Sequence, residues 1–469
     1  MAGNVTSLFR DGTGAGPVDF RVPGNPYFPT PGMFDELSAR LREIVTSRPG
    51  DTDTVTAELC ALLGLPPQCV VMGNGAAELI AWIDHLLVRD SLAVPVPVSA
   101  RWTGRPAESG KRVDMFPLQE ADGFALDLDR YAGFLRARGS RAAVVCNPNN
   151  PDGGHLRRER LVRFLDAMAD LDLLVVDESY LDFADAEPEP SVAREAVLRP
   201  NVIVLRGLGG NLGLPGVHCG YLVAHPALAG RVRAVLPRRN LGSLAERVVS
   251  MLRDHGPAYA RSLDRLRDDR REMTARLSAL PGLTVYPSQA NFLFVRLPVG
   301  AEGTLVRDRL LTGHRILVRD CGDKIGSSSR FLRLAVRPQA DVRRLVPALE
   351  QVLYDSGPAG GSGYSSGTAT VDRLIGETSG AGLRLAGSGP AGPAPRPAVP
   401  APAVGTGVPL PAAVPPMPVA PPVPMAPWAP TPPGVPARGG LTAAQVRGTV
   451  RPVETRPRKE DRPWQSTGT

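Results

Sequence analysis

The chain has 469 residues, of which 43% are hydrophobic, so it can bury a sizeable core and hold two or three domains. Its formal net charge is +7, but residues 356–469 contribute +5 (ten basic minus five acidic residues) and residues 1–355 only +2, which argues against nucleic-acid binding by the folded part. Five cysteines without a CxxC pair argue against a disulfide framework and a zinc site and favour a cytoplasmic location, and the lack of a run of about 20 apolar residues argues against a membrane span.

Residues 1–33 are expected to form an N-terminal arm. Glycine and proline are frequent in this segment, which contains Asn25-Pro26-Tyr27 near its end, and such a composition favours extended chain over helix. Apolar residues at helical spacing then predict amphipathic helices over residues 33–45 and 55–65.

Strand-like and helical segments alternate over residues 70–223. Apolar runs predict strands at 70–73, 92–98, 112–118, 142–146, 173–176, 202–205 and 221–223. Helical spacing predicts helices at 76–88, 128–138 and 157–171. This alternation indicates an α/β fold, with a large domain built on a mainly parallel sheet between helices.

A smaller α+β domain is predicted to follow. Long helices are expected at 243–255 and 259–280, then short strands and helices at 283–286, 292–295, 302–311, 316–318, 332–336 and 340–353. The large domain is therefore predicted at residues 34–255 and the small domain at residues 256–355.

Residues 356–469 are rich in glycine and serine and then in proline, alanine and valine. Such a composition buries too little apolar surface to offset the entropy lost on ordering, so it predicts a disordered C-terminal tail with polyproline II character. The tail is interpreted either as a spacer or as an element that binds a protein partner.

Four motifs occur in a fixed order along the chain. Asn147–Gly153 reads Asn-Pro-Asn-Asn-Pro-Asp-Gly and follows one apolar run, and Asp177 and Tyr180 follow the next. Asn25-Pro26 precedes them and Phe331-Leu332-Arg333 comes late in the chain. On these motifs, residues 20–353 resemble the fold-type I pyridoxal-phosphate enzymes of the class I/II aminotransferase superfamily, in particular histidinol-phosphate aminotransferases and threonine-phosphate decarboxylases.

The resemblance implies pyridoxal phosphate as the cofactor and assigns roles to matching residues. Asp177 would pair with the pyridine nitrogen, and Asn150 and Tyr180 would hydrogen-bond the phenolic oxygen of the ring. Arg333 would bind a substrate carboxylate in a two-pronged ion pair, with Asn25 in the same substrate site. The positions that hold the cofactor phosphate in the family are occupied here by two further residues, Ala76 and His218.

The superfamily motif Arg-Thr-Phe-Ser-Lys-x-x-Gly-Leu-x-Gly-x-Arg-x-Gly-Tyr matches residues 206–221 without a gap and places Gly210 at the position of the Schiff-base lysine. Loss of that lysine removes both covalent capture and the general base. Other departures are Gly209 for the phosphate-cup serine, His218 for the phosphate-clamping arginine, Ala76 for a small polar residue, Ser99 for the ring-stacking aromatic (with Trp102 close by), and no tyrosine near Arg48. The chain has three lysines, Lys111, Lys324 and Lys459, of which Lys324 is a remote candidate for a substitute.

Three functions are compatible with this pattern. The first is a catalytically impaired homologue that acts as a regulator or scaffold, and the second is an active aminotransferase or decarboxylase with a substitute lysine or non-covalently held pyridoxamine phosphate. The third is a protein that binds a different carboxylate metabolite through Arg333. A homodimer is expected in each case, because enzymes of this fold build their pockets at a two-fold interface; no metal site is predicted.

Overall fold

The computed structural model describes residues 16–355, so the predicted tail lies outside the described residues. The large sheet has seven strands in the order β2-β8-β7-β6-β5-β3-β4. β4, β3, β5, β6 and β7 run parallel, while β8 is antiparallel to β7 and β2. The strands are β2 (Val70–Gly73), β3 (Ser91–Val96), β4 (Arg112–Pro117), β5 (Ala142–Cys146), β6 (Leu173–Asp177), β7 (Val202–Gly207) and β8 (Gly220–Ala224). The predicted mainly parallel sheet is therefore confirmed.

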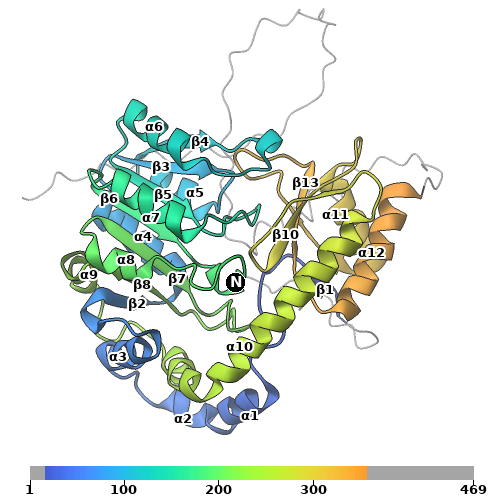
Figure 1. The fold of residues 1–469 in the computed structure, drawn as a ribbon. Helices are drawn as coiled ribbons and strands as arrows, with labels where there is room; N and C mark the ends of the chain where they lie inside the picture. The colour runs from blue at the N-terminus through green and yellow to red at the C-terminus, as the bar shows by residue number, and fades with distance from the viewer. Residues whose placement is uncertain (1–15, 356–469) are drawn as a thin grey trace, which may run out of the picture. The chain divides into compact units, whose positions relative to one another are not determined.

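Helices cover both faces of this sheet (Figure 1). One face packs against α3 (Thr52–Leu63), α6 (Leu128–Arg138), α7 (Arg158–Ala167) and α8 (Ala193–Leu198), and α1 (Pro31–Ala39) and α2 (Leu41–Thr46) join the same core next to α10 (Ser243–Ser278). The other face packs against α4 (Gly75–Leu87), α5 (Arg101–Glu108) and α9 (Pro226–Arg233). Since both faces are buried, the central strands β5, β6 and β7 are apolar except at their C-terminal ends, where β6 carries Asp177 and β7 carries Arg206.

A second sheet has four antiparallel strands in the order β12-β13-β10-β9. They are β9 (Thr284–Val285), β10 (Phe292–Arg296), β12 (Arg319–Asp320) and β13 (Phe331–Ala335), and they share a core with α11 (Gly303–His314) and α12 (Gln339–Tyr354). The arm joins this part of the chain, because β1 (Val18–Asp19) pairs in parallel with β11 (Ile316–Leu317).

One long helix replaces two predicted ones. The prediction of separate helices at 243–255 and 259–280 is wrong, since α10 (Ser243–Ser278) runs for 36 residues with Pro257 inside it. An internal proline costs roughly 3 kcal/mol, but the two halves of α10 are held in different cores: Val248 packs under the large sheet and Met273 packs against the small one. This helix crosses residue 255, where the boundary between the large and the small domain is predicted; the position of that boundary stays a prediction.

Other differences are local. The helix predicted at 33–45 is interrupted at Arg40, and α5, α8, α9, β1 and β12 were not predicted from the sequence. α5 is eight residues long and contains Gly104 and Pro106, so its helical signal is weak.

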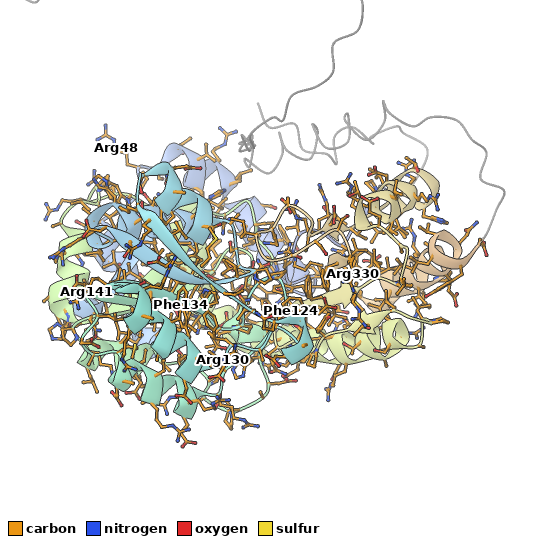
Figure 2. The ribbon with its side chains drawn as sticks, turned by 90° about the horizontal axis from the view of Figure 1, so that it is seen from above. Arg48, Phe124, Arg130, Phe134, Arg141 and Arg330 are labelled. Carbon is orange, nitrogen blue, oxygen red and sulfur yellow. The ribbon has the colours of Figure 1, made fainter. Side chains whose placement is uncertain are left out.

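Aromatic rings connect the two sheets. Phe124, on the loop after β4, lies 5.3–5.5 Å from the rings of Tyr286, Phe294 and Phe331 in edge-to-face contacts. Figure 2 shows Phe124 and Arg330 at this junction. The contacts hold β10 and β13 next to the C-terminal ends of the large-sheet strands, where ligands bind in open α/β sheets.

A buried ion-pair network ties β6 and β7 together at those strand ends. Arg206 on β7 donates from Nη1 to Glu178 Oε2 over 3.0 Å and from Nη2 to Asp182. Asp182 also accepts from Tyr259 Oη on α10 (2.8 Å) and from Asn211 Nδ2 (2.9 Å). The fully buried Glu178 accepts further bonds from Ser191 and Val192. Through these bonds one guanidinium links β6, β7, α10 and the glycine-rich loop formed by residues 209–216.

We expect Arg206→Met to lower the free energy of unfolding by about 3–5 kcal/mol, because it leaves two carboxylates without their cation. Arg163→Met is the matched control, since the Arg163 side chain is 67% exposed and pairs with an exposed Glu159, and its loss should be below about 1 kcal/mol. Urea unfolding of the full chain measures both; equal losses would show that the network does not stabilise the fold.

Candidate functional site

Three of the predicted site residues lie together. Asn150 follows β5 and donates from Nδ2 to Tyr180 Oη over 3.3 Å, and Arg333 on β13 donates from Nη1 to Asn150 Oδ1 over 2.9 Å. Tyr180 packs edge-to-face on Phe292, with ring centroids 5.0 Å apart. The structure therefore joins the ends of β5 and β6 to the small sheet through one polar cluster.

Arg333 retains binding capacity within this cluster. Its Nη2 donates to the backbone oxygen of Arg21 on the arm (2.7 Å), and its guanidinium lies 5.2 Å from the centre of the Phe292 ring. Its Nε is buried and has no hydrogen-bond partner among the described residues. Burial lowers the pKa of Arg333 from its ordinary value, so a bound anion would relieve both the missing bond and the buried charge.

Asp177 is supplied with donors by the protein itself. Its Oδ2 accepts from Trp102 Nε1 on α5 over 2.8 Å, and its Oδ1 accepts from the backbone N (3.0 Å) and Oγ (2.5 Å) of Ser179. Trp102 is 1% exposed and fills the core on this face of the sheet. A carboxylate with three internal donors is satisfied at a strand end without a pyridine nitrogen.

The glycine-rich loop packs closely on the N-terminal arm. A Cβ on Gly209 would lie 2.2 Å from the backbone oxygen of Val217, and one on Gly213 (φ +67°) would lie 1.7 Å from that of Phe28. A Cβ on Gly210, by contrast, would meet nothing closer than the backbone oxygen of Pro23, at 3.8 Å. The loop has room for a Cβ at Gly210 but none at Gly209, the positions that the resemblance matches to the Schiff-base lysine and the phosphate-cup serine.

The other predicted residues do not join the cluster. Ala76 is half-buried in the first turn of α4, and His218 is exposed. Asn25 is 4% exposed and makes structural bonds, donating from Nδ2 to Ser262 Oγ on α10 (2.7 Å) and accepting from the backbone N of Tyr27 (3.0 Å). Ala76, His218 and Asn25 therefore do not form an anion-binding site together in this structure.

Lys324 is a remote candidate by sequence, but in the structure it lies within reach of the charge of Arg333. Its loop follows β12, and its Nζ donates to the backbone oxygen of Val98 over 3.1 Å, one residue before Ser99. Burial, followed by the charge of Arg333, lowers the pKa of Lys324 to about 8. The rarity of lysine in the chain was the sequence signal that could have singled it out.

A cavity of about 760 Å³ lies beside this region and is lined by Cys146, Asn149, Asp152, His155 and Arg270, among others. Burial raises the pKa of Asp152 to about 6 and lowers that of His155. None of Asp177, Tyr180 and Arg333 lines it, so we place the functional site at the polar cluster, where the charges and the unpartnered Arg333 Nε lie.

The residues present fit pyridoxal phosphate poorly. Gly210 offers no amine, Gly209 cannot carry a hydroxyl without a shift of the backbone, and the exposed His218 has no fork of donors for a phosphate. No group of three or more His, Cys, Asp or Glu within residues 16–355 is placed to hold a metal ion. No helix among the described residues is long and apolar enough to cross a bilayer.

Comparisons with known proteins agree with the observed fold. The family described as "Aminotransferase class I and II" matches residues 42–349. The chain is 32% identical over 333 residues to the uncharacterized protein y4rO of Sinorhizobium fredii, covering 70% of this chain and 53% of that one. It is 30% identical over 347 residues to the CMP-5'-(3-aminopropyl)phosphonate synthase of Streptomyces rubellomurinus, covering 74% and 54%.

This chain thus spans about half the length of those two relatives. Among solved structures, a decarboxylase from Sulfurospirillum multivorans superimposes with a TM-score of 0.67 at 26% identity, over 72% of this chain and 89% of the other.

We expect Gly209→Ala to destabilise the protein by about 1–3 kcal/mol, because the added Cβ overlaps the backbone of Val217. Gly210→Ala is the matched control and should change stability by less than about 0.5 kcal/mol, since its Cβ meets only ordinary contacts. Thermal unfolding of the two variants tests the loop geometry, which would be wrong if the order were reversed.

Proposed function

Since this chain belongs to the class I and II aminotransferase family, we propose that it is a catalytically impaired member that binds a small carboxylate at Arg333 and acts as a regulator or scaffold. The observation that carries the proposal is Gly210, at the position that the resemblance assigns to the Schiff-base lysine. Without an amine there, the family's covalent capture and its proton transfer at the substrate carbon have no group to perform them.

The residue at the position that the resemblance assigns to the cofactor phosphate also supports a catalytically impaired protein. An arginine would offer a permanent charge and paired donors, whereas His218 offers an exposed imidazole. The internal donors to Asp177 explain why this acid is present without invoking a pyridine: Trp102 and Ser179 need its oxygens to satisfy their own buried N–H and O–H groups.

Arg333 supports carboxylate binding. The guanidinium is held in place by Asn150 and by the arm's Arg21 backbone oxygen, so little side-chain entropy remains to be lost on binding. Its buried Nε is left for an external acceptor. A carboxylate there would gain a charge-assisted hydrogen bond, and Tyr180 Oη lies within the same cluster as a second donor.

We expect pyruvate to bind the purified full chain with an affinity that falls about 10- to 100-fold in Arg333→Leu, which corresponds to one charge-assisted bond. Arg330→Leu is the matched control: its side chain is 57% exposed on the same segment, and binding should be unchanged. Isothermal titration calorimetry makes the measurement. Binding that is equal in both variants, or undetectable in the wild type, would contradict carboxylate recognition by Arg333.

The proposal includes a homodimer. Apolar side chains are exposed on α1 and α2, where Phe34, Leu41 and Val45 are 49%, 53% and 73% exposed. Exposed apolar groups on adjacent turns favour a protein contact.

We therefore expect light scattering after gel filtration to give twice the mass of the chain, and Leu41→Asp/Val45→Asp to give a monomer, because the charges would have to be buried in the interface. Leu198→Asp, at a 74% exposed position on α8, should leave the dimer intact. A monomeric wild type would remove this part of the proposal.

A further inference from the structure

We infer that Lys324 captures the carbonyl group of a small 2-oxo acid as an imine, with the carboxylate of that acid held by Arg333. This inference rests on the proposed carboxylate site and assigns it a ligand class. It requires no pyridoxal phosphate, because the amine and the anion-binding group both belong to the chain.

The contacts of Lys324 and Arg333 form one continuous path. Arg333 donates to Asn150, and the neighbouring Asn149 donates from Nδ2 to the backbone oxygen of Pro97 over 3.0 Å. The next residue, Val98, accepts from Lys324 Nζ. Arg333 therefore lies at the end of β5 and Lys324 at the end of the neighbouring strand β3, close enough for the charge of Arg333 to act on Lys324.

The loop that carries Lys324 is placed by close packing. Gly326 has a φ of +80°, and a Cβ there would lie 3.0 Å from the backbone of Val96 and Pro97. The loop also bonds to itself, as Lys324 N donates to the Cys321 oxygen over 3.1 Å. Such contacts hold the amine against the end of β3 instead of leaving it in solvent.

The electrostatic surroundings favour the free amine, which is the nucleophilic form. Burial and the like charge of Arg333 both oppose protonation of Lys324, the arrangement by which lysine nucleophiles are activated in proteins. The other charged or titratable groups that act on Lys324, or on which it acts, are Arg319, Cys321, Asp323, Cys146 and Asp152.

The step balances without a further reagent. The Nζ lone pair of the neutral amine forms a bond to the carbonyl carbon. The two Nζ protons pass to the carbonyl oxygen, the C–O bond breaks to release water, and a C=N bond remains. The reaction is reversible, and the imine draws electrons from the adjacent carbon atoms. Cyanoborohydride adds a hydride to the imine carbon and makes the adduct permanent, so the captured lysine can be identified.

The test is to incubate the full chain with pyruvate and cyanoborohydride at about pH 8 and to map the adduct by peptide mass spectrometry. About half of Lys324 is unprotonated there, compared with less than about 1% of an ordinary lysine, so we expect modification of Lys324 to exceed that of Lys111 and Lys459 at least tenfold. Lys111 is the internal control, since it is paired with Asp84 over 2.9 Å.

Three further arms sharpen the result. Lys324→Met and Lys324→Arg should each abolish the adduct, and Arg333→Leu should reduce it about tenfold or more. Acetone, which lacks a carboxylate, should label Lys324 at least tenfold less than pyruvate does, and Arg333→Leu should not lower that labelling. Equal labelling of the three lysines, or labelling of Lys324 that is independent of Arg333, would overturn the inference. If the wild type forms no adduct but pyruvate still binds Lys324→Met reversibly, the carboxylate site stands and imine formation is wrong. If pyruvate binds neither protein, both the carboxylate site and imine formation are wrong.

Discussion

The Arg206 guanidinium is the constraint on which the site depends. It neutralises Glu178 and Asp182 at the ends of β6 and β7, and through Asp182 it fixes Tyr259 of α10 and Asn211 of the glycine-rich loop. These bonds fix the chain on both sides of Tyr180, which lies between the two acids in sequence. They thereby position the Tyr180 hydroxyl that accepts from Asn150, which in turn accepts from Arg333. A polar cluster at a sheet edge needs such support because each buried donor or acceptor left unpaired is costly.

The arm determines what the site can hold. Its backbone passes over the glycine-rich loop closely enough that Gly213 cannot carry a side chain, and it supplies the oxygen of Arg21 that positions Arg333. The atom nearest to a Cβ on Gly210 would be a backbone oxygen of the arm, that of Pro23 at 3.8 Å, which is an acceptor and not a donor.

The strands of the large sheet could be predicted because their apolar runs are continuous, and β5 and α6 have the predicted bounds. The contact of Asn150 with Tyr180 and Arg333 could also be predicted, because Asn150 and Tyr180 follow the ends of neighbouring strands and the resemblance places Arg333 in the same pocket. Local composition could not predict that α10 continues through Pro257, because packing in two cores holds it. Nor could it predict that Trp102 binds Asp177 or that Lys324 reaches Val98, since both contacts depend on how distant segments pack.

Loss of cofactor chemistry is the central claim, and an absorption spectrum tests it most directly. The purified full chain is mixed with excess pyridoxal phosphate, passed through a desalting column, and its spectrum compared with that of free cofactor. We expect colourless protein with no retained aldimine band, because Gly210 provides no amine and His218 does not clamp the phosphate. A yellow protein that retains the cofactor through the column would contradict the claim and would support an active pyridoxal-phosphate enzyme.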